Sequence, residues 1–215
     1  MKMPDLSKTI FPSKILFLNP SLRGQNNSCA VYVDRDGTLI RHVDYLSSPD
    51  KMELLPGVKE SVHALIDRGV HFFIFTNQSG VGRGYFPIET VYACQQRLFE
   101  LLECAPYQIS GWCIAPEAPN EKGGYRKPSP RYIEETANYF GFKKEDSHVI
   151  GDTMVDLETA WNSGANAWAV GNGKKDLVEA HKSGSITGGN YEFAESFPHC
   201  VDIILKKSQS DILCR

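Results

Sequence analysis

Short apolar runs alternate with segments of helical periodicity along most of this chain. Ala30–Val33 is an uninterrupted apolar run, as expected for a buried strand, and Val58, Val62 and Leu65 then recur at the spacing of one helix face. The alternation predicts further strands over residues 71–75, 109–115, 148–150, 165–170 and 201–205, and further helices from residue 87 and over 130–140 and 155–163. Strands that alternate with single helices predict an α/β fold, here a Rossmann-like three-layer sandwich with a central parallel sheet.

The first 28 residues follow a different pattern. Pro4, Pro12 and Pro20 interrupt them, and they end in the polar stretch 25–28. We therefore interpret residues 1–28 as an N-terminal extension and residues 29–215 as one domain. No long insertion separates the elements of that domain, which leaves no room for a separate cap domain, and residues 35–56 could form only a short flap.

Composition narrows the class of protein. The 215 residues are 41% hydrophobic, enough for a full core, and carry a formal net charge of −3. This balance argues against nucleic-acid and membrane partners, and no apolar run reaches the roughly 20 residues needed to span a bilayer. The six cysteines include no CxxC pair, which predicts a soluble protein in a reducing, cytoplasmic location. The oligomeric state stays open.

Two carboxylates follow the first predicted strand, at the edge where a parallel sheet binds ligands. Asp34 and Asp36 stand two residues apart and are followed by Gly37. One carboxylate can act as a nucleophile or metal ligand, and the other as a general acid and base. An Asx-type turn would use the same residue types, so the motif alone leaves both interpretations open.

The second and third predicted strands are also followed by polar groups. Thr76 and Asn77 end the second strand, and the glycine-rich stretch 78–84 can cradle a phosphate, although a turn alone also favours glycine. Arg126 and Lys127 precede a helix that two prolines introduce. These two cations can neutralise a phosphate, with an exposed basic pair as the alternative.

The fourth predicted strand ends at Asp152, and Asp156 follows one helical turn later. Carboxylates gathered at one sheet edge suit Mg²⁺. Asp156 fits equally well as a charge that stabilises the N-terminus of a helix. Taken together, the four clusters provide a nucleophile, an acid and base, a phosphate cradle, a cation and a metal site, which are the requirements of phosphoryl transfer.

Four motifs carry a family resemblance. DRDGTL, TNQSGVGRG, RKPSP and GDTMVD, in this order between residues 31 and 173, resemble the motifs of the haloacid dehalogenase (HAD) superfamily of phosphatases. Within subfamily III they resemble the branch that holds D-glycero-D-manno-heptose 1,7-bisphosphate phosphatase and histidinol-phosphatase. The resemblance implies a HAD-like fold and Mg²⁺-dependent hydrolysis of a small phosphate ester through an aspartyl-phosphate, with a sugar phosphate such as the heptose bisphosphate as substrate.

The resemblance also implies a role for individual residues. Asp34 would be the nucleophile and Asp36 the general acid and base, and Thr76 and Lys127 would complete the catalytic set. Mg²⁺ would be held by Asp34, by the backbone carbonyl of Asp36 and by Asp152. The positions that would bind substrate are Arg35, His42, Tyr45, Asn77, Gln78, Ser79 and Arg126.

The chain departs from this branch at two places. The branch commonly carries a zinc loop of the form CPHHP followed by CxCRKP, but here the four ligand positions are Ala115, Glu117, Gly123 and Tyr125. We therefore expect no zinc. Thr153 stands where a lysine often follows the last aspartate, which removes one substrate contact.

Three other functions are open at this point. Histidinol-phosphatase belongs to the same branch, polynucleotide 3′-phosphatases share a similar TNQ-G-RG arrangement, and a phospho-accepting or ligand-binding module could use the same fold without turnover. The acidic charge balance argues against a nucleic-acid substrate. Asp36 argues against a module without turnover, because such a module needs no acid and base beside its nucleophile.

Overall fold

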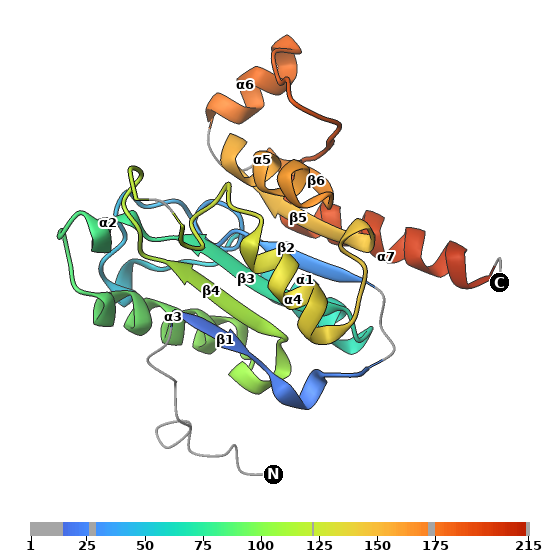
Figure 1. Cartoon of the computed structure of the whole chain (residues 1–215), viewed down its shortest axis with the longest axis horizontal. Helices are drawn as coiled ribbons and strands as arrows, with labels where there is room; N and C mark the ends of the chain where they lie inside the picture. Colours follow the sequence, from blue (N-terminus) through green and yellow to red (C-terminus); the bar gives the residue numbers. More distant parts are fainter. Residues whose placement is uncertain (1–14, 26–28, 122, 172–174, 214–215) are drawn as a thin grey trace.

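A mostly parallel β-sheet forms the centre of the chain (Figure 1). The computed structural model describes residues 15–25, 29–121, 123–171 and 175–213. Within these residues the sheet has seven strands in the order β1-β4-β3-β2-β5-β6-β7, and only the β1–β4 pairing is antiparallel. The strands are β1 (Leu16–Leu18), β2 (Ala30–Val33), β3 (His71–Asn77), β4 (Gly111–Ala115), β5 (Ser147–Gly151), β6 (Asn166–Val170) and β7 (Glu192–Ala194).

Helices cover both faces of the sheet, which confirms the three-layer α/β sandwich. They are α1 (Val58–Asp67), α2 (Ser79–Gly82), α3 (Ile88–Leu102), α4 (Arg131–Phe140), α5 (Met154–Ser163), α6 (Lys175–Ser183) and α7 (Phe197–Leu213), with short 3₁₀ turns at Pro20–Leu22, Pro49–Lys51, Pro106–Gln108 and Lys144–Asp146. Because side chains alternate along a strand, β2 contributes to two cores. Val31 and Val33 pack with α1, α3 and α7, whereas Tyr32 packs with α4 and α5.

The strands predicted from the apolar runs are confirmed, with one exception. Residues 201–205, predicted as a strand, belong to helix α7. The buried residues there are Phe197, Cys200, Val201 and Ile204, which is the i, i+3, i+4, i+7 spacing of one helix face. The prediction was wrong because a short apolar run fits a strand and a helix equally well, and the period appears only when Phe197 and Cys200 are included.

Part of the predicted N-terminal extension joins the sheet. β1 pairs with β4, and the buried Asn19 side chain donates from Nδ2 to the backbone oxygens of Tyr107, at 2.6 Å, and Ile109, at 3.1 Å. Residues 1–14 and 26–28 of that extension lie outside the described residues. None of the described helices is both long enough and apolar enough to cross a membrane.

The order of the strands determines where a ligand can bind. β2 lies between β3 and β5, so the connections that leave β2 and those that leave β5 run to opposite edges of the sheet. This is the topological switch point of a doubly wound sheet, and ligands bind beyond the carboxyl ends of its strands. Residues 34–57, between β2 and α1, form a flap that holds one 3₁₀ turn and the isolated bridge between Ile40 and Leu54.

Candidate active site

Three aspartates meet beyond the carboxyl ends of β2 and β5. Asp34, Asp152 and Asp156 are all buried, and one carboxylate oxygen from each lies within 4.8 Å of the others. The loop after β2 passes close to this cluster at Gly37, whose φ is +95°. A Cβ atom there would lie 2.2 Å from Oδ2 of Asp152, so only glycine allows the loop and the carboxylate to approach this closely.

Lys127 lies among these carboxylates. Its Nζ is 2.6 Å from Oδ1 of Asp34 and 2.5 Å from Oδ1 of Asp156. The other oxygen of Asp156 accepts hydrogen bonds from the backbone N–H and hydroxyl of Thr153, which forms a capping box at the start of α5. Asp156 therefore caps a helix, as the helix-start interpretation predicted, and it also belongs to the buried charge cluster.

The cluster perturbs the charges of its members. Burial raises the pKa of Asp34 to about 8; Lys127 opposes this rise, and the negative charges of Asp156, Asp152 and Asp36 add to it. Burial alone would lower the pKa of Lys127, but Asp156 and Asp34 outweigh that effect and raise it. Lys127 therefore keeps its positive charge, while the carboxylates compete for a single cation. A divalent cation would relieve this repulsion.

Asn77 orients Lys127 through the backbone. Its Nδ2 donates to the carbonyl oxygen of Lys127 at 3.1 Å, and its Oδ1 accepts the Lys127 N–H at 2.9 Å. The sequence predicted Asn77 as a phosphate contact. In the structure its amide is engaged with the segment that carries the lysine.

The Asp36 carboxylate lies against four donors. The Arg35 guanidinium lies 2.8 Å from Oδ2 through Nη2 and 3.1 Å from the same oxygen through Nε. Gln78 donates to Oδ2 at 2.9 Å, and Thr76 donates to it at 3.3 Å. Arg35, predicted to bind substrate, is fully buried beneath this carboxylate. Its position therefore allows it to hold Asp36 but not to contact a molecule in the pocket.

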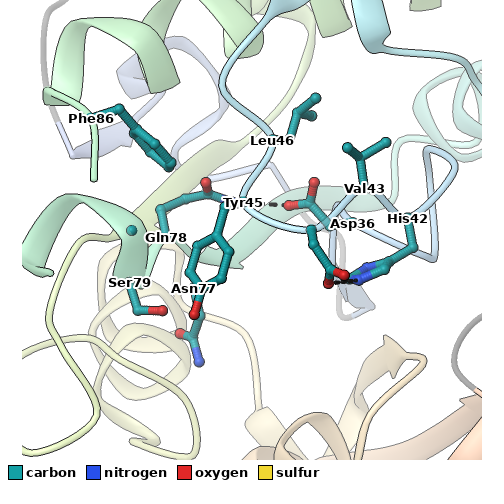
Figure 2. A pocket seen from close by; sticks show the side chains of 11 residues that line it. Asp36, His42, Val43, Tyr45, Leu46, Asn77, Gln78, Ser79 and Phe86 are labelled. Atoms are coloured by element: carbon teal, nitrogen blue, oxygen red, sulfur yellow. Dashed lines mark hydrogen bonds and ion pairs between the residues drawn. The ribbon is translucent and has the colours of Figure 1, made fainter. Parts of the chain in front are cut away.

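A pocket of about 250 Å³ opens beside Asp36 (Figure 2). Its lining comes from the flap and from the end of β3 with helix α2, and comprises Asp36, His42, Val43, Asp44, Tyr45, Leu46, Asn77, Gln78, Ser79, Gly80 and Phe86. Five of the seven residues predicted to bind substrate therefore line it. Arg35 and Arg126 are not among the lining residues. Arg126 instead donates from Nη1 to the carbonyl oxygen of Glu117 at 3.3 Å.

Two tyrosines that sequence reasoning did not connect meet beside this pocket. Tyr45, which lines it, has a left-handed backbone with φ of 47° and packs edge-to-face on Tyr85, with 4.8 Å between ring centroids. Both rings are about half exposed. Within the flap, His42 Nε2 lies 3.0 Å from Oδ1 of Asp44. A signal for Tyr85 existed in the sequence, because an aromatic pair follows the glycine-rich loop at 85–86.

The four positions that match zinc ligands in the resembling branch do not form a zinc site. Ala115 and Gly123 offer no side-chain donor. Glu117 Oε1 accepts the backbone N–H of Tyr125 at 2.9 Å, and the Tyr125 hydroxyl donates to Glu135 at 2.6 Å. Structural zinc prefers thiolate and imidazole in a tetrahedral arrangement, so the residues present do not fit that metal. Sequence reasoning missed the role of Glu117 in this loop.

The chain matches one family model and is similar in sequence to several known proteins. Residues 124–197 match the HAD-hydrolase-like family model. The chain is 31% identical over 160 residues to the D-glycero-D-manno-heptose-1,7-bisphosphate 7-phosphatase of Thermosynechococcus vestitus, covering 69% of this chain and 82% of that protein. It is 33% identical over 138 residues to the histidine biosynthesis bifunctional protein HisB of Legionella pneumophila, covering 63% of this chain and 39% of that protein.

Solved structures share the fold. The D,D-heptose 1,7-bisphosphate phosphatase from Bordetella bronchiseptica, complexed with magnesium and phosphate, superposes with a TM-score of 0.72 at 24% identity, over 84% of this chain and 99% of that one. The Burkholderia thailandensis phosphatase of the same name superposes with a TM-score of 0.62 at 23% identity, over 83% and 99%. By its sequence and its fold, the chain belongs to the HAD-like hydrolase family, on the branch of the heptose bisphosphate phosphatases.

Proposed function

We propose that this chain is a Mg²⁺-dependent phosphatase that hydrolyses a small sugar phosphate through an aspartyl-phosphate. The observation that carries the proposal is the placement of Asp34. It is a buried carboxylate at the end of the central strand, 2.6 Å from the Lys127 ammonium and beside two further aspartates. Asp36, two residues later in the chain, lines a pocket. A nucleophile, a cation and an acid thus converge where phosphoryl transfer needs them.

In the first half-reaction a carboxylate oxygen of Asp34 attacks phosphorus. The new bond between phosphorus and this oxygen creates an acyl phosphate, and the bond from phosphorus to the ester oxygen breaks. Asp36 donates a proton to the departing oxygen, which leaves as an alcohol. Lys127 offsets the negative charge that gathers around the transferring group.

In the second half-reaction water attacks the same phosphorus. Asp36, now ionised, takes a proton from that water, and the bond from phosphorus to the Asp34 oxygen breaks. Inorganic phosphate and the free Asp34 carboxylate result, and Asp36 is protonated again for the next cycle. Arg35, Thr76 and Gln78 keep the Asp36 carboxylate at the wall of the pocket in the meantime.

The residues at the cluster fit Mg²⁺. Asp34 and Asp156 share the Lys127 ammonium, Asp152 lies beside them, and hard oxygen ligands of this kind suit that ion. Asp34, Asp152 and the backbone carbonyl of Asp36 would hold it, while Asp156 is engaged with Lys127 and Thr153. When bound, Mg²⁺ would neutralise the phosphate oxygens and the carboxylates around them.

Heptose 1,7-bisphosphate is the first candidate substrate, because several similar relatives carry that name. Two features leave room for other sugar phosphates. Among the described residues, none that lines the pocket is a lysine or arginine, and Thr153 stands where the resembling branch often has a lysine. Histidinol phosphate is the second candidate, since HisB proteins also match.

Phosphate release from a panel of monoesters tests the proposal. The panel contains the heptose bisphosphate, sugar monophosphates, histidinol phosphate, a 3′-phosphorylated oligonucleotide and p-nitrophenyl phosphate. We expect turnover of at least one sugar phosphate with Mg²⁺, loss of turnover with EDTA, and loss in Asp34→Asn. Phosphate release that survives Asp34→Asn would contradict the mechanism. Binding of phosphate without any release would identify a module without turnover.

The remaining expectations follow from the same assignment. We infer that residues 29–215 form the phosphatase domain, with β1 added to its sheet from the preceding segment. A cytoplasmic location is consistent with Cys29, Cys94, Cys104, Cys113 and Cys200, which are free thiols in the described part of the chain. Fractionation of the cells that make this protein would test the location.

A further inference from the structure

A hydrogen bond to the Glu117 side chain closes the loop that leads into Lys127. Oε1 of Glu117 accepts the backbone N–H of Tyr125, eight residues later, at 2.9 Å. The carbonyl oxygen of Glu117 accepts from Nη1 of Arg126 at 3.3 Å. Burial lowers the pKa of Arg126, and the negative charge of Glu117 opposes that change. Glu117 thus contacts both residues that precede the catalytic lysine.

The loop is shaped around this carboxylate. A Cβ atom at Gly124 would lie 1.7 Å from Oε1 of Glu117, so a side chain there would displace the contact. Oε2 of Glu117 is buried and accepts no hydrogen bond from the residues that the structure describes. A carboxylate oxygen that is merely part of a surface loop turns toward water, because burial without a donor costs free energy. The inward position of Glu117 therefore indicates a specific contact rather than a solvated side chain.

Each arm of the loop is anchored to a different helix. On the first arm, the Pro116 carbonyl accepts the N–H of Gly82, at the end of α2. On the second arm, the Tyr125 hydroxyl donates to Glu135 of α4, and Arg131 of α4 lies over the Tyr125 ring at 4.6 Å. Glu117 joins the two arms. Glu117 and Tyr125 are themselves two of the four zinc-ligand positions implied by the resemblance, so a hydrogen bond joins the two arms where the resembling branch would use a metal.

We propose that Glu117 is a positioning residue for Lys127. The kinetic part of this inference rests on the proposed function. Asn77 fixes the backbone of Lys127 at one point, and the Glu117–Tyr125 hydrogen bond fixes the chain two residues earlier. Two anchors define the direction of the chain, which a single anchor does not. The Lys127 ammonium consequently stays between Asp34 and Asp156.

Three variants separate this role from general damage to the loop. Glu117→Leu removes the acceptor, and Glu117→Gln keeps a carbonyl oxygen that can accept the Tyr125 N–H. Glu121→Leu is the matched control: Oε2 of Glu121 accepts the N–H of Ala118 at 2.8 Å, the same type of bond in the same loop, but it spans only three residues and is exposed.

Hydrogen exchange measures the loop without reference to turnover. In Glu117→Leu we expect amide exchange of the peptide over residues 123–127, which contains the Tyr125 N–H, to rise at least tenfold, with wild-type exchange in Glu117→Gln and Glu121→Leu. A zinc chelator should leave exchange of the wild-type loop unchanged. Equal protection in Glu117→Leu and wild type would overturn the inference, as would a rise in exchange on zinc removal.

Kinetics then test positioning. We expect kcat to fall at least tenfold in Glu117→Leu with a smaller change in KM, and both constants to stay near wild type in Glu117→Gln and Glu121→Leu. Faster exchange with unchanged kcat, or Glu117→Gln as impaired as Glu117→Leu, would overturn the role. If Glu117→Leu does not fold, Glu117→Asp, which keeps the charge but is one methylene shorter, replaces it with the same expectations. If the wild-type protein hydrolyses no substrate, the proposed function is refuted. The exchange data would still show whether the Glu117–Tyr125 hydrogen bond holds the loop.

Discussion

The side-chain amide of Asn77 and the backbone of Lys127 hold each other through two hydrogen bonds, one in each direction. The last residue of β3 therefore influences the charge cluster indirectly, through the backbone of Lys127. In Asn77→Ala both bonds are lost, and we expect kcat to fall by about 10- to 100-fold because the ammonium is no longer held in place. Steady-state kinetics on the best substrate of the panel measures this effect.

Asn77→Asp is the control for that variant. It keeps the oxygen that accepts the Lys127 N–H and loses the donor to the Lys127 carbonyl, so its kcat should lie between those of wild type and Asn77→Ala. A wild-type kcat in Asn77→Ala would show that the lysine is positioned without this residue.

Gly37 is predicted to be irreplaceable. Its φ of +95° disfavours any other residue, and a methyl group would lie against the Asp152 carboxylate. Gly37→Ala should destabilise the fold by about 1–3 kcal/mol and weaken Mg²⁺ binding at least tenfold. Denaturant unfolding and titration calorimetry check the two effects. Gly141→Ala is the control: its φ of +85° is also left-handed, but a Cβ atom there meets nothing within 4 Å, so Mg²⁺ affinity should be unchanged.

The contribution of Asp34 to the stability of the metal-free protein should fall as the pH rises through the range 4–8. The pKa of Asp34 is about 8 in the folded state and about 4 in the unfolded chain. The folded state therefore binds one more proton than the unfolded chain over that range, and its stability falls as the proton is lost. Mg²⁺ competes with this proton and should bind more tightly at higher pH. Unfolding free energies of wild type and Asp34→Asn, with EDTA and with Mg²⁺, isolate the contribution. It is contradicted if the difference between them in EDTA is constant with pH.

His148 should contribute the opposite pH dependence. Burial lowers its pKa to about 4, and its Nδ1 accepts the indole N–H of Trp168 at 3.0 Å, which requires a neutral ring. The unfolded chain binds a proton near pH 6.5, so stability should fall by about 3 kcal/mol as the pH drops from 6.5 to 4. A glutamine side chain cannot titrate but can still accept from Trp168. His148→Gln should therefore flatten the acid limb, and a variant that keeps the wild-type slope would refute this assignment.

Tyr45 and Tyr85 should act on substrate affinity together. Their edge-to-face contact joins the flap to the turn before α3. We expect either alanine variant to raise KM several-fold, and the double variant to raise it less than the product of the two, with a coupling of about 0.5–1.5 kcal/mol. Tyr107, equally exposed but paired with neither ring, is the control, and Tyr107→Ala should not change KM. Strictly multiplicative effects would show that the rings act independently.

Most of the sheet could be predicted from the sequence because buried parallel strands appear as unbroken apolar runs. Ala30–Val33 and the stretch Phe72–Phe75 within β3 follow that rule. β1 and β7 were not predicted. β1 lies in the apolar run Ile15–Leu18, but the prolines on either side of that run favoured an extension. β7 is three residues long and only partly buried, so neither its length nor its pattern separates it from a loop. Helix α7 shows the reverse case, in which a true apolar run belongs to a longer helical period.

The location of the site was predictable, whereas the direction of several side chains was not. Strand ends determine where Asp34, Thr76 and Asp152 lie, and the alternation of elements predicts a parallel sheet in which these ends share one edge. Arg35 and Asn77 stand at the same strand ends, but their hydrogen bonds are to Asp36 and to the Lys127 backbone. Such contacts depend on rotamers and on residues distant in sequence, and no local pattern records them.

The antiparallel edge strand β1 has a consequence for the order in which the chain assembles. Leu16 pairs with Cys113, almost one hundred residues later, whereas β2, β3 and β4 are joined by successive crossovers. Closure of so long a loop is slow, and the partner must already exist. During synthesis β1 therefore has to wait until β4 has emerged, and its docking is a late event. The strands that carry Asp34 and Thr76 can pair before the first strand of the sequence finds its place.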